Sequence, residues 1–272
     1  MADIAVLGAG GWGMALAISA TGAGNSVTIW SPFEEEVKML SEKRTNERLL
    51  SGVTLPESIK ITTDMSCVEG AVLTIIATPS TAVRSVAAQL SEYKNYGIVV
   101  NVSKGLEKGT LLRLSQVISD ELKNPKGVAV LSGPSHAEEV ARGIPTSIVA
   151  ASESHTTAQI VQSIMSAENL RIYTSDDLIG VELGGALKNI SIGIASTAGK
   201  TYIHTAGVTT KAAELFSKLP EQDHFLESMA DACKAVIDYK GAQNMLYINV
   251  ANRLSVDCDC DSHPAEPEMG DL

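Results

Sequence analysis

The sequence is poor in aromatic residues, cysteine and positive charge. Aromatic side chains make up 4% of the 272 residues, so a folded core must consist mainly of Ala, Val, Ile and Leu. Four cysteines are too few for a disulfide framework in a chain of this length, which favours a reducing compartment. The formal net charge of −11 opposes binding to nucleic acid or to an anionic membrane surface, and the sequence contains no basic patch that could override it.

Long hydrophobic runs are absent as well. No apolar run approaches the roughly 20 residues that a membrane-spanning helix needs. The first residues, MADIAVLGAGGWG, lack the basic region of a signal peptide, and glycines interrupt their apolar run. We therefore expect a cytoplasmic globular protein that binds neither membrane nor nucleic acid.

Short apolar runs alternate with amphipathic segments over residues 1–175. These runs are continuously apolar, which is typical of parallel strands covered by helices on both faces. The pattern predicts an α/β fold with a doubly wound, mostly parallel sheet. The predicted strands and helices are, respectively, residues 4–8, 26–30, 71–78, 97–103, 127–133 and 146–152, and residues 11–22, 34–44, 80–90 and 110–122.

The pattern changes near residue 176. Residues 176–199 are predicted to form one long apolar helix that begins with two aspartates, which suit the positive end of the helix dipole. A small, atypical C-terminal segment follows, with a helix expected at 222–240 and a strand at 244–252. The chain therefore divides into residues 1–175 and a helix-led region, residues 176–272.

The sequence GAGGWG, residues 8–13, lies between a predicted strand and a predicted helix. Gly8 permits a tight turn, Gly10 lets the backbone approach a pyrophosphate, and Gly13 allows close packing of helix on strand. We interpret residues 1–175 as a Rossmann-type dinucleotide-binding domain, with a glycine-rich turn that binds nothing as the alternative. The end of the second strand, Trp30 to Pro32, supplies neither the acid typical of NAD sites nor the arginine typical of NADP sites, so both cofactors stay open.

Two lysines are candidate ligand contacts. Lys104 follows a predicted strand at the edge where open α/β sheets bind ligands, although a solvated surface lysine is the alternative. Gly133 and Ser135 follow the next strand and can present an amide and a hydroxyl to the same ligand. Lys188 lies in the apolar helix, within GGALKN, where burial would lower its pKa and suit it to proton transfer. A solvated lysine on an exposed stripe is again the alternative.

Four segments carry a resemblance to a known family. GAGGWGMALA, VSKGLE, LSGPSHAEEVARGIPT and GVELGGALKN occur in this order, and together they resemble bacterial-type NAD(P)-dependent glycerol-3-phosphate dehydrogenase. Residues 46–59, NERLLSGVTLPESI, are similar to a loop of that family. The resemblance covers residues 1 to about 190. It implies an oxidoreductase that interconverts sn-glycerol 3-phosphate and dihydroxyacetone phosphate with NAD or NADP.

The resemblance also implies a role for each matched residue. Lys188 would be the catalytic acid and base, giving a proton to the carbonyl oxygen of dihydroxyacetone phosphate and accepting one from glycerol 3-phosphate. Pro32 stands where the family commonly has Arg or His, which leaves the cofactor preference in doubt. The implied cofactor contacts are Gly8, Gly10, Gly11, Trp12, Gly13, Lys104 and Ala137. The implied substrate contacts are Lys104, Gly133, Ser135 and Lys188.

The sequence departs from this family after residue 190. The Asp near the catalytic lysine and the Arg–Asn pair that binds the substrate phosphate have no counterpart there, and Arg171 and Arg253, the only arginines beyond residue 150, lie in other contexts. We therefore expect an impaired enzyme, or a dinucleotide-binding module without turnover. Whether the chain forms a homodimer stays open.

The last part of the chain resembles something else. From about residue 184 to 272 the sequence is similar to part of an uncharacterised family often associated with 4Fe–4S ferredoxin modules, and that family also has a GGALKN-like segment. The chain thus looks like a hybrid joined at this hexapeptide. Cys258 and Cys260 do not have the spacing of a cluster motif, so no metal ligand is assigned. A metal-related function of this acidic segment remains an alternative to a disordered tail.

Overall fold

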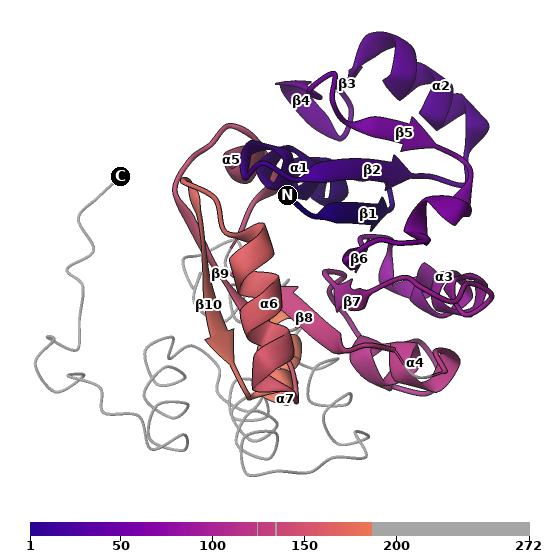
Figure 1. Cartoon of the computed structure of the whole chain (residues 1–272), viewed down its shortest axis with the longest axis vertical. Helices are drawn as coiled ribbons and strands as arrows, with labels where there is room; N and C mark the ends of the chain where they lie inside the picture. Colours follow the sequence, from indigo (N-terminus) through magenta and orange to yellow (C-terminus); the bar gives the residue numbers. More distant parts are fainter. Residues whose placement is uncertain (124, 134, 187–272) are drawn as a thin grey trace, which may run out of the picture. The chain divides into compact units, whose positions relative to one another are not determined.

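An eight-stranded sheet runs through the part of the chain that the computed structural model describes, residues 1–123, 125–133 and 135–186 (Figure 1). The predictions for residues 222–240 and 244–252, and for Lys188, Cys258 and Cys260, lie outside these residues. The strand order is β10-β9-β8-β7-β6-β1-β2-β5. The bounds are β1 (Asp3–Leu7), β2 (Ser26–Trp30), β5 (Lys60–Thr62), β6 (Leu73–Ile76), β7 (Ile98–Asn101), β8 (Val128–Ser132), β9 (Thr146–Ala151) and β10 (Leu170–Ser175).

All neighbouring strands of this sheet are parallel except β8 and β9. The prediction of a mostly parallel sheet is therefore confirmed, with one antiparallel pair that the continuously apolar sequence of β9 did not reveal. The connection from β8 to β9 contains only the short helix α5 (Ala137–Ala141), which packs on α1 (Gly11–Gly22). Because this connection does not cross back over the sheet, β9 starts near the end of β8 and runs in the opposite direction.

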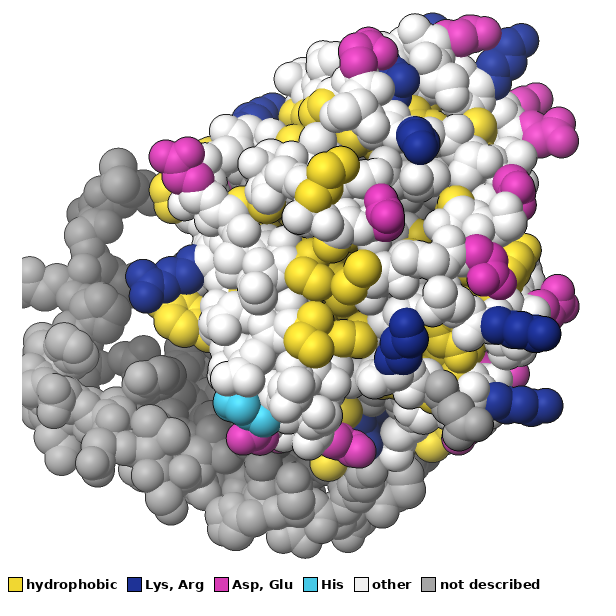
Figure 2. All heavy atoms as spheres, in the orientation of Figure 1, with side chains coloured by type: hydrophobic (Ala, Val, Ile, Leu, Met, Phe, Trp, Pro, Cys, Tyr) yellow, Lys and Arg dark blue, Asp and Glu magenta, His cyan; other side chains and the backbone are white. Residues whose placement is uncertain are grey.

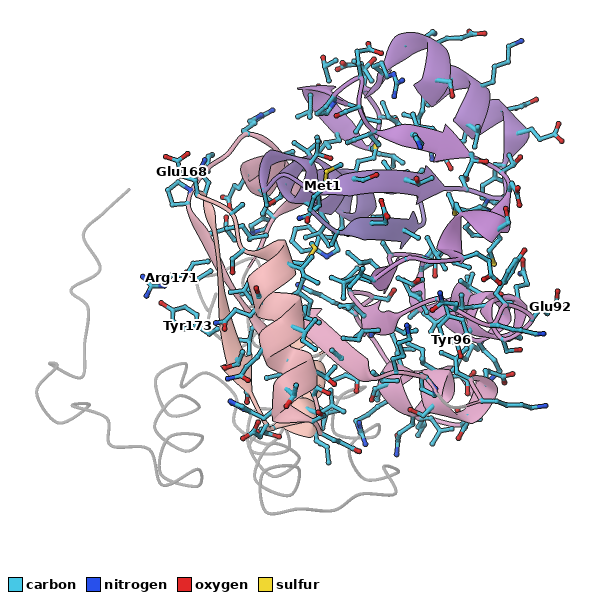
Figure 3. The ribbon with its side chains drawn as sticks, viewed as in Figure 1. Met1, Glu92, Tyr96, Glu168, Arg171 and Tyr173 are labelled. Carbon is cyan, nitrogen blue, oxygen red and sulfur yellow. The ribbon has the colours of Figure 1, made fainter. Side chains whose placement is uncertain are left out.

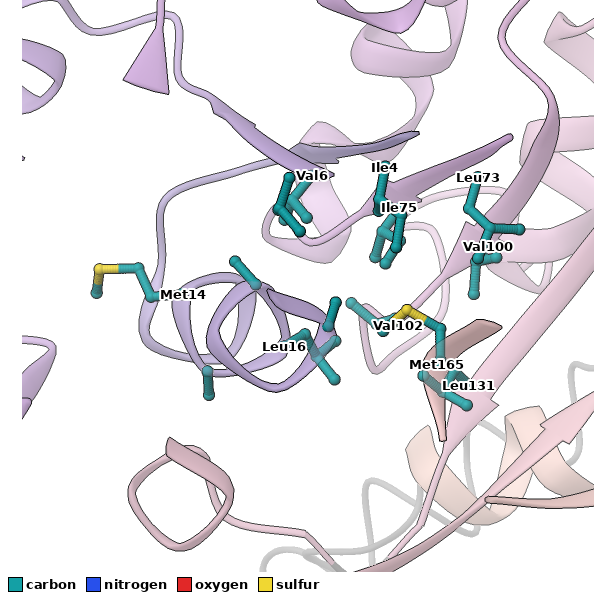
Figure 4. Close-up of a cluster of buried hydrophobic side chains, with 14 of the residues drawn as sticks. Ile4, Val6, Met14, Leu16, Leu73, Ile75, Val100, Val102, Leu131 and Met165 are labelled. Atoms are coloured by element: carbon teal, nitrogen blue, oxygen red, sulfur yellow. The ribbon is translucent and has the colours of Figure 1, made fainter. Parts of the chain in front are cut away.

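Helices cover both faces of the sheet. One apolar cluster lies between the sheet and α1, α2, α5 and α6; in Figure 4, Leu16 of α1 faces Val102, which directly follows β7. A second cluster lies between the other face and η1, α3 and α4. This is the doubly wound arrangement predicted from the sequence. The remaining bounds are α2 (Glu34–Lys43), η1 (Met65–Val68), η2 (Ser80–Ala82), α3 (Val83–Leu90), α4 (Leu114–Glu121), α6 (His155–Met165) and α7 (Leu178–Ala186).

Several elements were not predicted. The segment expected to be a loop contains a two-stranded antiparallel hairpin, β3 (Thr45–Asn46) and β4 (Leu50–Thr54). Strand β10 forms one edge of the large sheet, and Figure 3 shows Arg171 and Tyr173 projecting from it side by side. The guanidinium carbon of Arg171 lies 5.2 Å from the centre of the Tyr173 ring, a cation–π contact.

Hydrophobic and charged side chains are interspersed on the surface drawn in Figure 2. Hydrophobic side chains gather near the middle of this face, and side chains of both charges lie around them. Among the helices that the structure describes, none combines the length and the apolar character needed to cross a membrane.

A buried carboxylate attaches α7 to the start of α4. The Glu182 side chain accepts hydrogen bonds from the amide of Ser115 at 2.8 Å, from the hydroxyl of Ser115 at 2.6 Å and from Nη1 of Arg113 at 3.2 Å. Glu182 is 4% exposed and Arg113 is 7% exposed. The amide of Ser115 belongs to the first turn of α4, where amides lack partners inside the helix, so Glu182 caps α4 from a distant part of the chain.

Replacing Glu182 by glutamine should lower the free energy of unfolding by about 3 kcal/mol, because the change removes the negative charge from a buried ion pair. Urea unfolding followed by circular dichroism measures this loss. The control is Glu153→Gln, the same change at an exposed position, which should stay within about 0.5 kcal/mol of the original chain. Equal losses in both variants would contradict the assigned role of the buried pair.

Candidate active site

The segments that follow β1, β6, β7 and β8 meet at one edge of the sheet. These four strands are parallel neighbours, so their carboxyl ends lie together. The segments contain the predicted site residues Gly8, Gly10, Lys104, Gly133 and Ser135. The strand order reverses between β1 and β6, and ligands of open α/β sheets bind outside the carboxyl ends at such a point.

The glycine loop has a backbone that larger residues would not permit. Gly8 has φ of +124°, and a Cβ at this position would lie 2.7 Å from the carbonyl oxygen of Ala77. A Cβ on Gly13 would overlap the carbonyl oxygen of Gly8, so Gly13 allows α1 to start directly against the turn. By contrast, a Cβ on Gly10 would meet no atom of the described residues within 4 Å, so these residues leave one side of the loop open. The loop therefore has the tight turn and the open face expected of a phosphate cradle.

Buried donors beside this loop lack partners in the described part of the chain. The indole nitrogen of Trp12 and the hydroxyl of Thr78 are both buried without a hydrogen bond there. In addition, no side chain caps the N-terminus of α1, so its first amides face outward from the helix. Unsatisfied buried donors are costly unless a ligand pairs with them. A dinucleotide with its pyrophosphate at the start of α1 fits this set of groups.

The start of α1 is also approached from two other elements. A Cβ on Gly11 would lie 2.6 Å from the carbonyl oxygen of Leu49, in the β3–β4 turn, and 3.8 Å from the Cβ of Ala137, at the start of α5. Two predicted cofactor contacts, Gly11 and Ala137, are thus close together. No sequence pattern indicates that Leu49 lies close to Gly11, because this contact depends on how the β3–β4 hairpin packs.

Lys104 extends from the end of β7 towards the segment after β8. Its Nζ donates a hydrogen bond to the carbonyl oxygen of Gly133 at 3.1 Å. The preceding residue, Ser103, donates from its hydroxyl to the carbonyl oxygen of Thr78 at 2.6 Å, and the amide nitrogen of the Asn101 side chain donates to the carbonyl oxygen of Ser103 at 3.1 Å. Ser103 and Asn101 therefore hold the turn that carries Lys104, although no sequence motif indicates this role.

Gly133 and Ser135 lie in this same turn. A Cβ on Gly133 would be 3.0 Å from the Cα of Ile148, so glycine permits the close approach of β9. The amide of Ser135 donates to the carbonyl oxygen of Gly133 at 3.0 Å, and Ser135 is 8% exposed. The structure thus brings Lys104, Gly133 and Ser135 together, as the predicted substrate contacts require.

Helix α7 packs close to Lys104 and the end of β8 at Gly185, one of the two glycines of GGALKN. A Cβ on Gly185 would overlap the hydroxyl of Ser132 and would lie 4.0 Å from Cγ of Lys104, whereas a Cβ on Gly184 would meet none of the described residues within 4 Å. Gly185 therefore allows α7 to pack against the end of β8 beside Lys104. Lys188, the predicted catalytic residue, lies outside the described residues.

Comparison with known proteins agrees with this geometry. Residues 3–158 match the family described as NAD-dependent glycerol-3-phosphate dehydrogenase N-terminus. The chain belongs to this family. Residues 179–272 match a second family, described as a domain of unknown function (DUF362), so the predicted hybrid of two families is also confirmed. The roles assigned to single residues in this dehydrogenase-family chain stay predictions.

The curated relatives are longer than this chain. It is 45% identical over 217 residues to glycerol-3-phosphate dehydrogenase [NAD(P)+] of Fusobacterium nucleatum, a match covering 78% of this chain and 64% of that protein. It is 43% identical over 215 residues to the protein of that name from Agathobacter rectalis, covering 78% and 63%. The crystal structure of glycerol-3-phosphate dehydrogenase from Coxiella burnetii, 30% identical, superposes with a TM-score of 0.70 over 94% of this chain and 81% of that one. The chain thus spans less than two thirds of the length of these two curated relatives.

The loop after Lys104 is fixed by a charged cluster. Nε and Nη2 of Arg84 contact the two carboxylate oxygens of Glu107 at 2.6 and 2.9 Å, and Nη1 contacts Glu121 at 2.5 Å. Hydrogen bonds from Arg84, together with one from Thr110, lower the pKa of Glu107 from its usual value of 4.5 to about 2. Because this pKa is lower in the folded protein, the contribution of Glu107 to stability is present above pH 4.5 and is lost as the pH falls through about 2.

Replacing Gly185 by alanine should destabilise the chain, because the added methyl group overlaps the Ser132 hydroxyl, at a cost of about 1–3 kcal/mol. The matched control, Gly184→Ala, should stabilise it by about 0.5–1 kcal/mol, since an added methyl group there meets none of the described residues and alanine favours helix. Thermal unfolding of both variants measures the difference. Ser132→Ala should restore part of the stability lost in Gly185→Ala; no restoration would contradict the proposed contact.

Replacing Arg84 by methionine should raise the pKa of Glu107 towards 4.5, because the guanidinium that stabilises its charged form is removed. Acid unfolding followed by fluorescence should then begin at a higher pH than in the original chain. Lys126→Met, which removes a positive charge from an exposed position outside the Arg84 cluster, should leave the acid transition unchanged. An identical acid transition in Arg84→Met and the original chain would contradict this prediction.

Proposed function

We propose that the chain binds NAD or NADP at the glycine loop and is an oxidoreductase interconverting sn-glycerol 3-phosphate and dihydroxyacetone phosphate. The observation that carries this proposal is the meeting of the glycine loop, Lys104 and the Gly185 segment of α7 at one edge of the sheet. Membership of the dehydrogenase family supports it. The proposal places the protein in the cytoplasm and leaves a homodimer open.

In this proposal the residues of the chain bind the substrate and move a proton. Lys104, which already contacts the carbonyl oxygen of Gly133, would contact both cofactor and substrate. A bound nicotinamide supplies or accepts hydride at the carbon that carries the reacting oxygen. The ammonium of Lys188 would donate a proton to the carbonyl oxygen of dihydroxyacetone phosphate, stabilising the negative charge that develops on it. In the reverse direction the neutral amine would accept the proton of the glycerol 3-phosphate hydroxyl.

A dinucleotide-binding module without turnover is the second candidate. Arg171, one of the two arginines beyond residue 150, stacks on Tyr173 at the edge strand β10 and does not belong to the groups gathered around Lys104. The other, Arg253, lies outside the described residues. Loss of a substrate-phosphate clamp removes several charge-assisted hydrogen bonds, each worth about 1.5–3 kcal/mol, which would lower turnover by orders of magnitude.

Two measurements on the full chain separate these candidates. Oxidation of NADH or NADPH with dihydroxyacetone phosphate measures turnover, and nicotinamide fluorescence measures cofactor binding. For the dehydrogenase, Lys188→Ala should abolish turnover and leave cofactor affinity within about threefold, because only the proton donor is removed. Binding without turnover in the original chain would favour the module, and absence of binding would remove both candidates.

A further inference from the structure

The chain that leaves β2 lies directly beside the glycine loop. The amide of Gly8 donates to the carbonyl oxygen of Trp30, the last residue of β2, at 2.9 Å. The next residue, Ser31, is fixed by its own amide, which donates to the carbonyl oxygen of Thr62 at 3.1 Å. In doubly wound folds the residues just after this strand contact the adenosine ribose of a dinucleotide, the only part that differs between NAD and NADP.

A carboxylate is held at this point by a buried serine. The hydroxyl of Ser31, which is 1% exposed, donates to Oε2 of Glu36 at 2.5 Å. Among the described residues, Oε1 of the same carboxylate has no hydrogen-bond partner, so it can accept a hydrogen bond from a ribose hydroxyl. From the sequence alone, Glu34 to Glu36 are more readily interpreted as a solvated first helical turn than as a ribose contact, because the contact between Ser31 and Glu36 depends on the fold of the β2–α2 turn.

Nearby charge also disfavours an additional phosphate. Glu34, Glu35 and Glu36 form the first turn of α2, and a 2′-phosphate would bring up to two further negative charges beside them. Arg44 is engaged elsewhere, since its Nη1 donates to the carbonyl oxygen of Ile59 at 2.7 Å. Arg48 is exposed in the β3–β4 turn, next to Leu49, whose carbonyl oxygen lies close to the glycine loop. Its positive charge could offset the repulsion of a 2′-phosphate by the glutamates.

We propose that this site selects NAD(H) against NADP(H), and that Glu36, held by Ser31, is the selecting group. The inference rests on the proposed dinucleotide site. Glu36 accepts a hydrogen bond from the ribose of NAD(H) and repels the 2′-phosphate of NADP(H).

The test compares the affinities of the full chain for NADH and NADPH by nicotinamide fluorescence. At low salt NADH should bind at least about tenfold more tightly, the size expected for a singly charged carboxylate facing a phosphate a few ångströms away. Glu36→Gln and Ser31→Ala should each reduce the ratio of NADH affinity to NADPH affinity to within about threefold. Glu42→Gln, the same charge change further along α2, should leave this ratio unchanged. Added salt should also narrow the ratio, because it screens the repulsion.

Several results would overturn the inference. Equal affinity for NADPH and NADH would contradict the selection of NAD(H). In that case, loss of NADPH binding in Arg48→Ala would identify Arg48 as the phosphate contact. A preference for NADH that neither Glu36→Gln, Ser31→Ala nor salt changes would exclude Glu36 as the selecting group. Binding of neither nucleotide would remove the dinucleotide site itself, a result distinct from binding without preference.

Discussion

The candidate site depends on close approaches between chain segments that leave no space for a side chain. A Cβ on Gly8 would lie 2.7 Å from the carbonyl oxygen of Ala77, and a Cβ on Gly185 would overlap the hydroxyl of Ser132. The first contact closes the glycine loop against the segment after β6, and the second brings α7 against β8. Glycine costs roughly 1 kcal/mol in a helix relative to alanine, but here it permits packing that alanine would obstruct.

Two charged clusters hold the segments around these contacts, and they differ in energetic weight. Glu182 is buried with Arg113, so losing either partner breaks a buried ion pair and costs several times more than losing a surface pair. Arg84 is more exposed, and water and salt weaken its attraction to Glu107. The first cluster is therefore expected to contribute more to the stability of the fold than the second, which holds the loop that follows Lys104.

The match to the second family begins within α7, whereas the dehydrogenase-family match ends at residue 158. The described part of α7 packs on β8 and β9 of the dehydrogenase-family sheet, although the DUF362 match already begins at residue 179. Gly185 and Glu182 thus have structural roles in the packing of residues 1–186. These residues include the groups that fit a dinucleotide, whereas the substrate contacts of the family have no recognisable counterpart after residue 190. Our proposal therefore treats cofactor binding and turnover as separate questions.

The sequence by itself determined strands β1, β2 and β6 to β9, helices α1 to α4, the doubly wound sheet and the glycine loop, because apolar periodicity and the spacing of glycines in GAGGWG are local properties. It also indicated the change of family near GGALKN. Only the tertiary structure decided that β9 runs antiparallel, that Lys104 contacts Gly133, and that Glu182 caps α4. The last two contacts join residues that are 29 and 67 positions apart. Contacts of this kind follow from the packing of distant segments, which sets steric fit and hydrogen-bond partners that a local sequence pattern does not contain.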